Sequence, residues 1–466
     1  MKVSLIGHAA ILVEVGGVTV LSDPWWRGPC FGAQWWIYPR PRIDLLDARP
    51  LDFIYVSHGH HDHFHPGTLQ SLPKTAKVLV SASSDLAVPI RALGFEVIEV
   101  PEDRPVDLGG AVQCRIMSTY GDDTLMTLTN GKEVCVNAND ALHSAPAEVQ
   151  ERFAAKLREL HPTIDYLFCG YGIASHFPNC YALPGKDREA STAHRQKHFN
   201  GEWVKLTAKI GPRFSLPFAA DVVFLDHDLF WVNEVTHNSQ RPTDLFRERH
   251  PSSSTTVIDP APGFVIEGGR VTTNALRVPV SAAALRADYA EEIARANRYG
   301  SVDPAEVGQV AELLRQNLEA CRAYLASFPH DYRVLIRFHG SSAGLMFEKN
   351  GSALSVVEAP DASAGCDLVY TTRLAYMRWA LTREHGHEIL FVGSGGIFEY
   401  LSDAVVPKGI HQEVIALVRK ANRAPRASRG YVGRALAAAK GGVKGLLRGK
   451  PSVDLYDLPT WTILQR

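Results

Sequence analysis

Ten residues, "VSHGHHDHFH" from Val56 to His65, limit what this chain can fold into more than any other stretch. They hold five histidines and one aspartate and overlap the end of the apolar run Phe53–Val56. A short apolar run of this kind is typical of a buried strand, and a buried strand places the residues that follow it at an edge of a sheet. So much imidazole at one sheet edge indicates a metal site.

Within this stretch, His58, His60, Asp62 and His63 have the spacing H-x-H-x-D-H. Alternate residues of an extended chain point the same way, so His58 and His60 can hold one cation. The turn that follows can present Asp62 and His63 to a neighbouring cation. A solvated histidine-rich turn is the alternative interpretation, and the regular spacing disfavours it.

The composition is that of an ordinary globular protein with room for two or three domains, at 466 residues, 45% hydrophobic and 21% charged. A net charge of −1 gives no overall attraction to nucleic acid or to an anionic membrane. The seven cysteines never form a C-x-x-C pair, and we find neither a cleavable leader nor a long uncharged apolar run. The sequence therefore predicts a cytoplasmic protein with no membrane span and no nucleic-acid partner.

Strands and helices are predicted to alternate through the first half of the chain. Residues 3–22 have the alternation of a hairpin, and residues 53–93 have the rhythm of strand, helix, strand and helix. Residues 95–139 are β-rich and end in a hairpin whose Asn130-Gly131 suits a type I′ turn. This order predicts an α/β fold in which helices cover two stacked sheets, an αββα sandwich.

From about residue 280 the pattern changes to long helices followed by strands. We therefore expect a first domain at 1–275 and a second, smaller α+β domain at 280–415, with a long helix beginning at Asp303-Pro304. Residues 416–466 form a basic tail rich in Lys, Arg, Ala and Gly. A solvated face is the simpler interpretation of this tail, and a membrane-surface or phosphate-binding arm is the alternative.

The H-x-H-x-D-H spacing resembles the signature of the metallo-β-lactamase superfamily. The segments "GHAAILVE" (7–14) and "LSDPW" (21–25) are similar to the opening hairpin of its lactonase and phospholipase-like branch, and the resemblance covers about residues 1–235. It implies that the first domain is a metallo-β-lactamase sandwich with a dinuclear metal site. It also implies that Asp140, in "VCVNANDA", bridges the two metals. His8 and Asp23 both lie near predicted strand ends, where they could orient the ligands, and for His8 a hydrogen-bonded core histidine is an equal alternative.

Two positions depart from the usual ligand set. Where many members place a third histidine, this chain has "STYGDDTLMTL", which makes Asp122 the nearest ligand, with Asp123 and Tyr120 as rivals. The last histidine is replaced by "LPFA", so His176 is the favoured substitute and His227 the alternative.

Carboxylates in place of imidazoles make a site harder and more anionic, which favours iron or manganese over Zn²⁺. The Gly121-Asp122 pair is similar to a diiron branch of the superfamily. That branch includes the chloramphenicol-pathway β-hydroxylase, the diiron hydroxylase of the platensimycin and platencin pathway and, more distantly, the metal domain of the CMP-sialic acid hydroxylases. The resemblance implies two iron ions that activate dioxygen.

Two further features bear on substrate binding. The Trp- and Pro-rich segment 23–36 is either a lid or substrate wall, or a set of aromatic rings packed under a long loop. The second domain resembles the sterol-carrier-like fold that accompanies some superfamily members, which implies a hydrophobic tunnel or a dimerisation module.

The leading hypothesis is a diiron monooxygenase that hydroxylates a bulky apolar small molecule, such as a carrier- or coenzyme A-bound secondary metabolite of diterpenoid type in antibiotic biosynthesis. The ligands would be His58, His60 and Asp122 for one iron, Asp62, His63 and His176 for the other, and Asp140 between them. An external electron donor is required, and a homodimer is left open. The alternative is a dizinc hydrolase acting on a lactone, ester or phosphodiester, and a non-catalytic binding module is a third reading.

Overall fold

The computed structural model describes residues 1–419 apart from residues 49, 103, 173, 174, 221, 298, 299 and 384, and the side chain of residue 48. The described chain divides into two compact units. The first unit consists of Met1–Ile173, Ala193–Phe224 and Asn233–Leu285, and the second of Ala174–Thr192, Leu225–Val232 and the chain from Arg286 onward. Two short segments within the expected first domain therefore belong to the second unit. The predicted basic tail lies outside the described residues from 420 onward.

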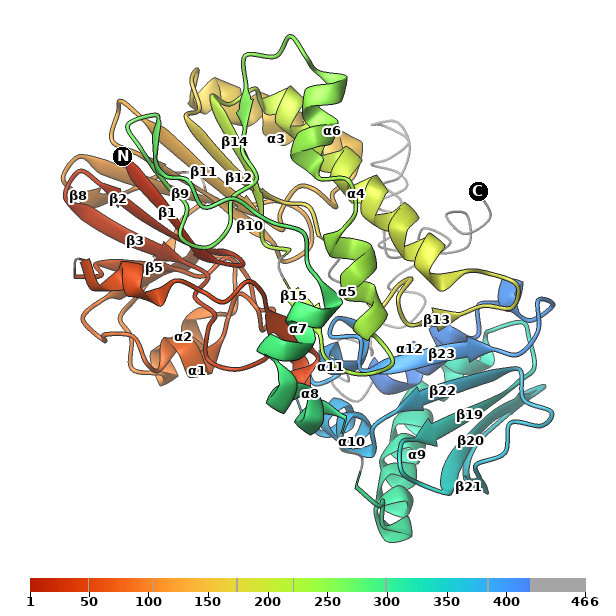
Figure 1. Ribbon diagram of the computed structural model, residues 1–466. Helices are drawn as coiled ribbons and strands as arrows, with labels where there is room; N and C mark the ends of the chain where they lie inside the picture. The colour runs from red at the N-terminus through yellow and green to blue at the C-terminus, as the bar shows by residue number, and fades with distance from the viewer. Residues whose placement is uncertain are drawn as a thin grey trace, which may run out of the picture. The chain divides into compact units, whose positions relative to one another are not determined.

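The first unit contains two large sheets (Figure 1). The eight-stranded sheet has the order β18 (Arg270–Thr273), β17 (Val265–Glu267), β1 (Lys2–Gly7), β2 (Ala10–Val15), β3 (Val18–Ser22), β5 (Phe53–Tyr55), β6 (Lys77–Ser81) and β7 (Val97–Val100). The seven-stranded sheet has the order β16 (Thr256–Val257), β14 (Phe214–Phe218), β12 (Tyr166–Gly170), β11 (Val134–Asn139), β10 (Thr124–Thr129), β9 (Val112–Ser118) and β8 (Val106–Gly109). A further pair joins β4 (Trp35–Ile37) to β15 (Val222–Phe224).

The side-chain alternation of the strands builds three apolar layers. In β1, Val3 and Leu5 enter the core shared by the two sheets, whereas Ile6 on the other face enters a second core. That second core contains residues of helices α1 (Pro66–Leu69) and α2 (Ala87–Ala92).

The outer face of the seven-stranded sheet is covered in the same way. Residues of α3 (Ala147–Leu160), α4 (Arg188–Ile210) and α6 (Pro242–Arg249) join its core cluster, among them Leu157 and Trp203, which are fully buried. Helices thus lie on both outer faces of two stacked sheets, which confirms the predicted αββα architecture. Strands buried on both faces read as continuous apolar runs, and this explains the weak alternation of the sequence.

Strand directions bring several loops to one edge of the sandwich. Strands β3, β5 and β6 run parallel, and β1 runs in the same direction because β2 is antiparallel to both β1 and β3. In the other sheet β11, β12 and β14 are parallel, while β10 is antiparallel to β9 and β11 and therefore begins where those strands end. Tyr55 and Thr124 connect the sheets at this edge, with their hydroxyl oxygens 2.7 Å apart.

Two turns differ from the sequence predictions. Residues 3–22 form three strands rather than one hairpin, because a further turn at His8 separates β1 from β2. The hairpin of β10 and β11 has a four-residue loop, since Thr129 pairs with Val134. Its Gly131 has a φ of 78° but Asn130 does not have a positive φ, so the turn is not type I′. The Asn130 side chain instead accepts hydrogen bonds from the two backbone N–H groups of Lys132 and Glu133.

The second unit is built on a six-stranded sheet in the order β13 (Tyr181–Ala182), β23 (Gly396–Tyr400), β22 (Leu368–Thr372), β19 (Tyr332–Phe338), β20 (Ala343–Asn350) and β21 (Ala353–Pro360). Its helices are α8 (Ala290–Ala296), α9 (Pro304–Ala326), α10 (Leu374–Thr382), α11 (Glu388–Phe391) and α12 (His411–Arg419), while α5 (Phe230–His237) and α7 (Ala282–Asp288) each include a boundary between the units. The Asp303 side chain caps α9 and Pro304 begins it, as predicted. Among the described residues, no helix is both long and apolar enough to cross a bilayer.

Candidate metal centre

The histidine-rich loop begins where β5 ends. Ser57 is 1% exposed, and its carbonyl oxygen accepts a hydrogen bond of 2.7 Å from the Thr124 hydroxyl at the start of β10. Thr124 in turn accepts, through its carbonyl oxygen, a hydrogen bond of 2.8 Å from the Asn139 side chain at the end of β11. These hydrogen bonds hold three loops from the two sheets together without help from a metal ion.

Asp23 fixes the orientation of His63. Its carboxylate accepts hydrogen bonds from the backbone N–H and the hydroxyl of Ser57, both at 2.8 Å. The same carboxylate lies 2.9 Å from Nδ1 of His63, and both side chains are fully buried. A proton on Nδ1 leaves Nε2 as the free donor atom, which is how metal-binding histidines are commonly oriented.

His63 faces two further carboxylates through Nε2. That atom lies 3.4 Å from Oδ2 of Asp62 and 3.4 Å from Oδ2 of Asp140. Nε2 of His63 and Oδ1 of Asp140 are buried and have no hydrogen-bond partner. A buried polar atom without a partner is costly, so these atoms fit a site that binds a cation.

A second set of donor atoms lies next to the first. Nε2 of His58 is 2.9 Å from Nδ1 of His60 and 3.7 Å from Oδ1 of Asp123. The rings of His58 and His63 are 4.1 Å apart, and one ligand atom from each of His58, His63 and Asp140 lies within 4.8 Å of the others. Asp140 is therefore within reach of both sets, the position that a bridging carboxylate needs.

The carboxylate that faces His58 is Asp123, not the predicted Asp122. Gly121, with a φ of 67°, turns the chain so that Asp122 is exposed. Asp123 directly precedes β10 and is half-buried at the sheet edge, with a side chain that is 20% exposed. Tyr120, the other rival, accepts a hydrogen bond from the Asp123 backbone N–H through its carbonyl oxygen. Strand geometry therefore favours the second acid of the pair.

His176 and His227, the two candidates for the last ligand, both belong to the second unit. The Nδ1 atom of His176 contacts the carbonyl oxygen of Phe391, and its Nε2 lies 3.0 Å from the Tyr181 hydroxyl. With both ring nitrogens engaged, His176 has no free atom for a metal. The side chain of His227 is exposed. These contacts argue against the predicted ligand role of His176, and we leave both residues out of the proposed ligand set.

Burial and neighbouring charges shift the pKa values of this cluster. Burial by itself would raise the pKa of Asp62, but the charge of His63 and the hydrogen bond with His8 hold it well below the usual value. Burial would lower the pKa of His63, but the charges of Asp62, Asp140 and Asp23 raise it well above 6.5. Without a metal, a proton on His63 balances these carboxylates.

Asp123 behaves differently because burial and a neighbouring carboxylate outweigh the charges of His60 and His63. Burial, followed by the charge of Asp140, raises the pKa of Asp123 to about 7. Burial, followed by the charges of His63 and His60, lowers the pKa of His58 well below 6.5. His58 is therefore a neutral imidazole, the form that binds metals.

Cations fit this donor set. Buried carboxylates without matching positive charge are strongly disfavoured, and here Asp23, Asp62 and Asp140 surround one histidine. Mixed carboxylate and imidazole donors suit iron, manganese and zinc, and a higher share of carboxylate favours the harder ions.

Sequence patterns did not point to His143 as part of the site. This residue is 5% exposed, its Nε2 lies 3.0 Å from the carbonyl oxygen of Gly172, and its Nδ1 is buried without a hydrogen-bond partner. It follows Asp140 by three residues, and that spacing is the one signal that could have pointed to it.

The aromatic rings of the Trp-rich segment pack under the loop. Trp25 is fully buried with its ring 5.2 Å from that of His8, and Phe31 stacks on His61 at 5.3 Å. Of the two interpretations, packing is therefore favoured for these rings, which shield one side of the histidine-rich loop from water.

Comparison with known proteins adds three relatives. A Mycobacterium tuberculosis protein, whose name describes it as a Rieske 2Fe-2S iron-sulfur protein, is 25% identical over 328 residues, 63% of this chain and 61% of that protein. The cytidine monophosphate-N-acetylneuraminic acid hydroxylase of Mus musculus is 24% identical over 287 residues, 58% of this chain and 48% of the hydroxylase. A metal-dependent hydrolase of Pyrobaculum aerophilum is 30% identical over 113 residues, 24% of this chain and 44% of the hydrolase. The chain thus spans about half of the length of the curated relatives it matches.

Solved structures resemble the chain only loosely. A metallo hydrolase from Ignicoccus hospitalis has a TM-score of 0.39 at 17% identity, and the match covers 57% of this chain and 97% of the hydrolase chain.

Residues 2–139 match the family model of the beta-lactamase superfamily domain. These residues contain the loop with the H-x-H-x-D-H spacing and strands of both stacked sheets. Residues 2–139 therefore carry a beta-lactamase superfamily domain.

Proposed function

We propose that this chain is a non-heme diiron monooxygenase. His58, His60 and Asp123 would hold one iron, and Asp62 and His63 the other, with Asp140 between them. The observation that carries the proposal is the meeting of three carboxylates, Asp62, Asp123 and Asp140, with histidines at one sheet edge. This donor set is richer in carboxylate than an all-histidine zinc site, which favours iron. The similarity to a hydroxylase and to a protein named for an iron–sulfur centre also supports redox chemistry.

A bound iron pair supplies the reductive activation of dioxygen. In the overall reaction a C–H bond becomes C–OH, and one O₂, two electrons and two protons are consumed as one water is released. The residues of this chain position the centre for that task. Asp23 and Ser57 hold His63 in one orientation, and Trp25 and Phe31 keep water from one side of the loop.

Two electrons must come from a donor outside the described residues. The cysteines within the described residues form no disulfide bonds, and all except Cys366 are buried. No group of possible metal ligands found among the described residues contains a cysteine. We propose an external electron donor, with an iron–sulfur protein as the class that the name of the mycobacterial relative suggests.

The substrate that the sequence resemblance implies is a bulky, largely apolar small molecule, either free or carried on coenzyme A or a carrier protein. The relatives do not narrow the choice of substrate, because one is named as a hydroxylase and another as a hydrolase, and these are different classes of reaction.

Oxygen uptake tests the reaction directly. Protein loaded with Fe²⁺ under anaerobic conditions should consume a stoichiometric amount of O₂ by itself and should sustain uptake only when a chemical reductant is supplied, and His58→Ala should abolish the sustained uptake. The exposed His227→Ala is the matched control and should leave uptake unchanged. If the iron-loaded wild type and His58→Ala consume O₂ at the same rate, the monooxygenase proposal is wrong.

A dizinc hydrolase is the second candidate, favoured by the similarity to the Pyrobaculum hydrolase. It predicts that the zinc-loaded protein cleaves a chromogenic lactone, ester or phosphodiester without O₂. Turnover of such a substrate with zinc, together with no reductant-dependent O₂ uptake with iron, would replace the first proposal by the second.

A further inference from the structure

We propose that His8 is a protein ligand of the second metal position, beside Asp62 and His63. The inference rests on the proposed dinuclear centre and adds a ligand that neither the sequence motif nor the relatives assign. Sequence reasoning predicts only an orienting role for His8.

The end of β14 leaves the second position short of a ligand. Phe218 ends this strand and Ala219 follows it, and neither side chain has a donor atom. The backbone N–H of Ala219 donates a hydrogen bond of 3.3 Å to the His8 carbonyl oxygen. The turn between β1 and β2 therefore brings an imidazole to the place where the last strand offers none.

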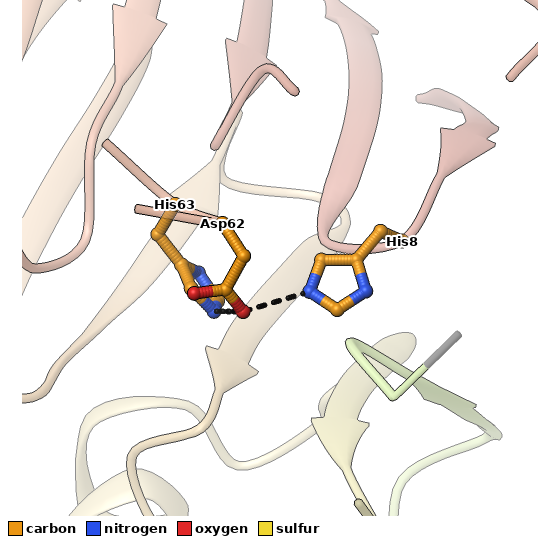
Figure 2. Close-up of side chains that lie close together, drawn as sticks. All are labelled: His8, Asp62 and His63. Atoms are coloured by element: carbon orange, nitrogen blue, oxygen red, sulfur yellow. Dashed lines mark hydrogen bonds and ion pairs between the residues drawn. The ribbon is translucent and has the colours of Figure 1, made fainter. Parts of the chain in front are cut away.

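The donor atoms of His8, Asp62 and His63 converge. Figure 2 shows the His8 ring approaching the Asp62 carboxylate from one side while His63 contacts it from the other. Nε2 of His8 lies 3.1 Å from Oδ2 of Asp62, which lies 3.4 Å from Nε2 of His63. All three atoms lie within 4.8 Å of one another. Two ligands at about 2.1 Å from one metal and at neighbouring positions are about 3.0–3.4 Å apart, so the spacing suits a shared ion.

The backbone of His8 is held in a conformation that few residues adopt. Its φ is 45°, in the left-handed region that favours glycine, although its side chain is 2% exposed. Such strain persists only where the surroundings impose it, and it gathers at functional sites. The Trp25 ring packs edge-on against the His8 ring with centroids 5.2 Å apart, which restricts how the imidazole can turn.

An orienting role predicts a different response to substitution. If His8 only donates a hydrogen bond to Asp62, the amide of Gln can replace it. If Nε2 binds the metal, Gln restores the hydrogen bond but not the imidazole. Asn is a second useful replacement because it tolerates a positive φ yet is too short to reach Asp62.

The experiment titrates metal-free protein with Mn²⁺ and counts bound ions by electron paramagnetic resonance. The wild type should bind two ions. His8→Asn and His8→Gln should bind the first ion normally and the second about 100-fold more weakly, and pulsed spectra should lose the nitrogen coupling of one imidazole. His227→Ala should match the wild type in both readouts, and thermal unfolding of the metal-free variants checks that they are folded.

The outcomes separate the two levels of the proposal. A wild type that binds no Mn²⁺ overturns the dinuclear centre and the role of His8 with it. A wild type that binds two ions, with a His8→Gln variant that also binds two at wild-type affinity and with unchanged nitrogen couplings, overturns the role of His8 alone.

Discussion

Two histidine clusters, one in each unit, have opposite surroundings. In the first unit the ring nitrogens of His63 face Asp23 on one side and Asp62 and Asp140 on the other, and Nε2 has no hydrogen-bond partner. The His58 ring contacts a second imidazole and Asp123. This cluster is anionic, and a bound cation would balance its charge and provide a partner for Nε2 of His63.

In the second unit the cluster of His176 and His411 faces tyrosine hydroxyl groups. His176 lies 3.0 Å from the Tyr181 hydroxyl, and Nδ1 of His411 lies 2.7 Å from the Tyr400 hydroxyl. Burial lowers the pKa of His411 to about 3, so this ring stays neutral. The second cluster is complete as a hydrogen-bonded network.

The same contrast holds for carboxylates. Asp62 and Asp140 have pKa values below the usual range, because the charge of His63 outweighs the effect of burial. Glu413 in the second unit is fully buried without such a partner, and burial raises its pKa to about 8. A buried histidine or acid alone is therefore no sign of a metal site, whereas opposed histidines and acids with unpartnered atoms are.

The largest effect should come from Asp140→Asn, which removes the charge shared by both metal positions. We expect at least one of the two metals to be lost and reductant-dependent O₂ uptake to fall by about three orders of magnitude, as for residues that act as a unit. Metal analysis after gel filtration and an oxygen electrode measure both. A variant that keeps two ions and normal uptake would show that Asp140 is not between the metals.

The neighbouring acids Asp123 and Asp122 offer the next test. Asp123→Asn should weaken binding of the metal at His58 and His60 about 100-fold, while the matched Asp122→Asn should change it less than about 2-fold, since only Asp123 faces the cluster. Competition with a metal indicator gives both affinities. Equal losses in the two variants would contradict the correction made at this position.

Metal affinity at the position of His58, His60 and Asp123 should depend on pH. The pKa of Asp123 in the metal-free protein is about 7, so below pH 7 a proton competes with the metal. We expect this proton alone to lower the affinity about fivefold between pH 7 and pH 6, because the deprotonated share of Asp123 falls from about one half to about one eleventh. Titrations at pH 6 and pH 7 measure the fall, and affinity that is constant over this range would contradict the assignment.

His176→Phe should separate the two clusters. Because His176 is completed by Tyr181 and Phe391, its loss should cost about 1–2 kcal/mol of unfolding free energy without changing the metal content. Urea unfolding and metal analysis on the same sample measure both. Loss of one metal with unchanged stability would restore His176 to the ligand set.

The smallest effect should come from Glu413→Gln. The folded pKa of about 8 lies above the usual glutamate value of 4.5, so the wild type is favoured at low pH and loses stability as the pH rises toward 8. Between pH 5 and pH 6 the wild type should lose about 1 kcal/mol relative to the Gln variant. Parallel pH dependences would show that Glu413 is charged in the folded protein.

Local patterns in the sequence predicted the sandwich and the loop that contains His58 and His63. Alternation and apolar runs report which strands are buried, and ligand spacing reports which side chains can share a cation. The choice between Asp122 and Asp123 depends on a turn at Gly121 and the exact start of β10, which a pattern does not resolve.

Contacts between residues that are far apart in the chain were the second limit on prediction from the sequence. His176 follows a strand of the first unit in sequence, yet it belongs to the second unit and bonds to Phe391, which is 215 residues away. His8 is the opposite case: it is far from Asp62 in sequence, yet its Nε2 lies 3.1 Å from Oδ2 of Asp62. No local signal encodes either contact.

Metal identity under competition tests the central claim most directly. Protein freshly purified from cells supplied with both iron and zinc, with His176→Phe as the structural control, should contain two irons per chain by mass spectrometry and Mössbauer spectroscopy. Two zinc ions per chain in wild type and control, with no iron bound, would contradict the account of a carboxylate-rich iron centre.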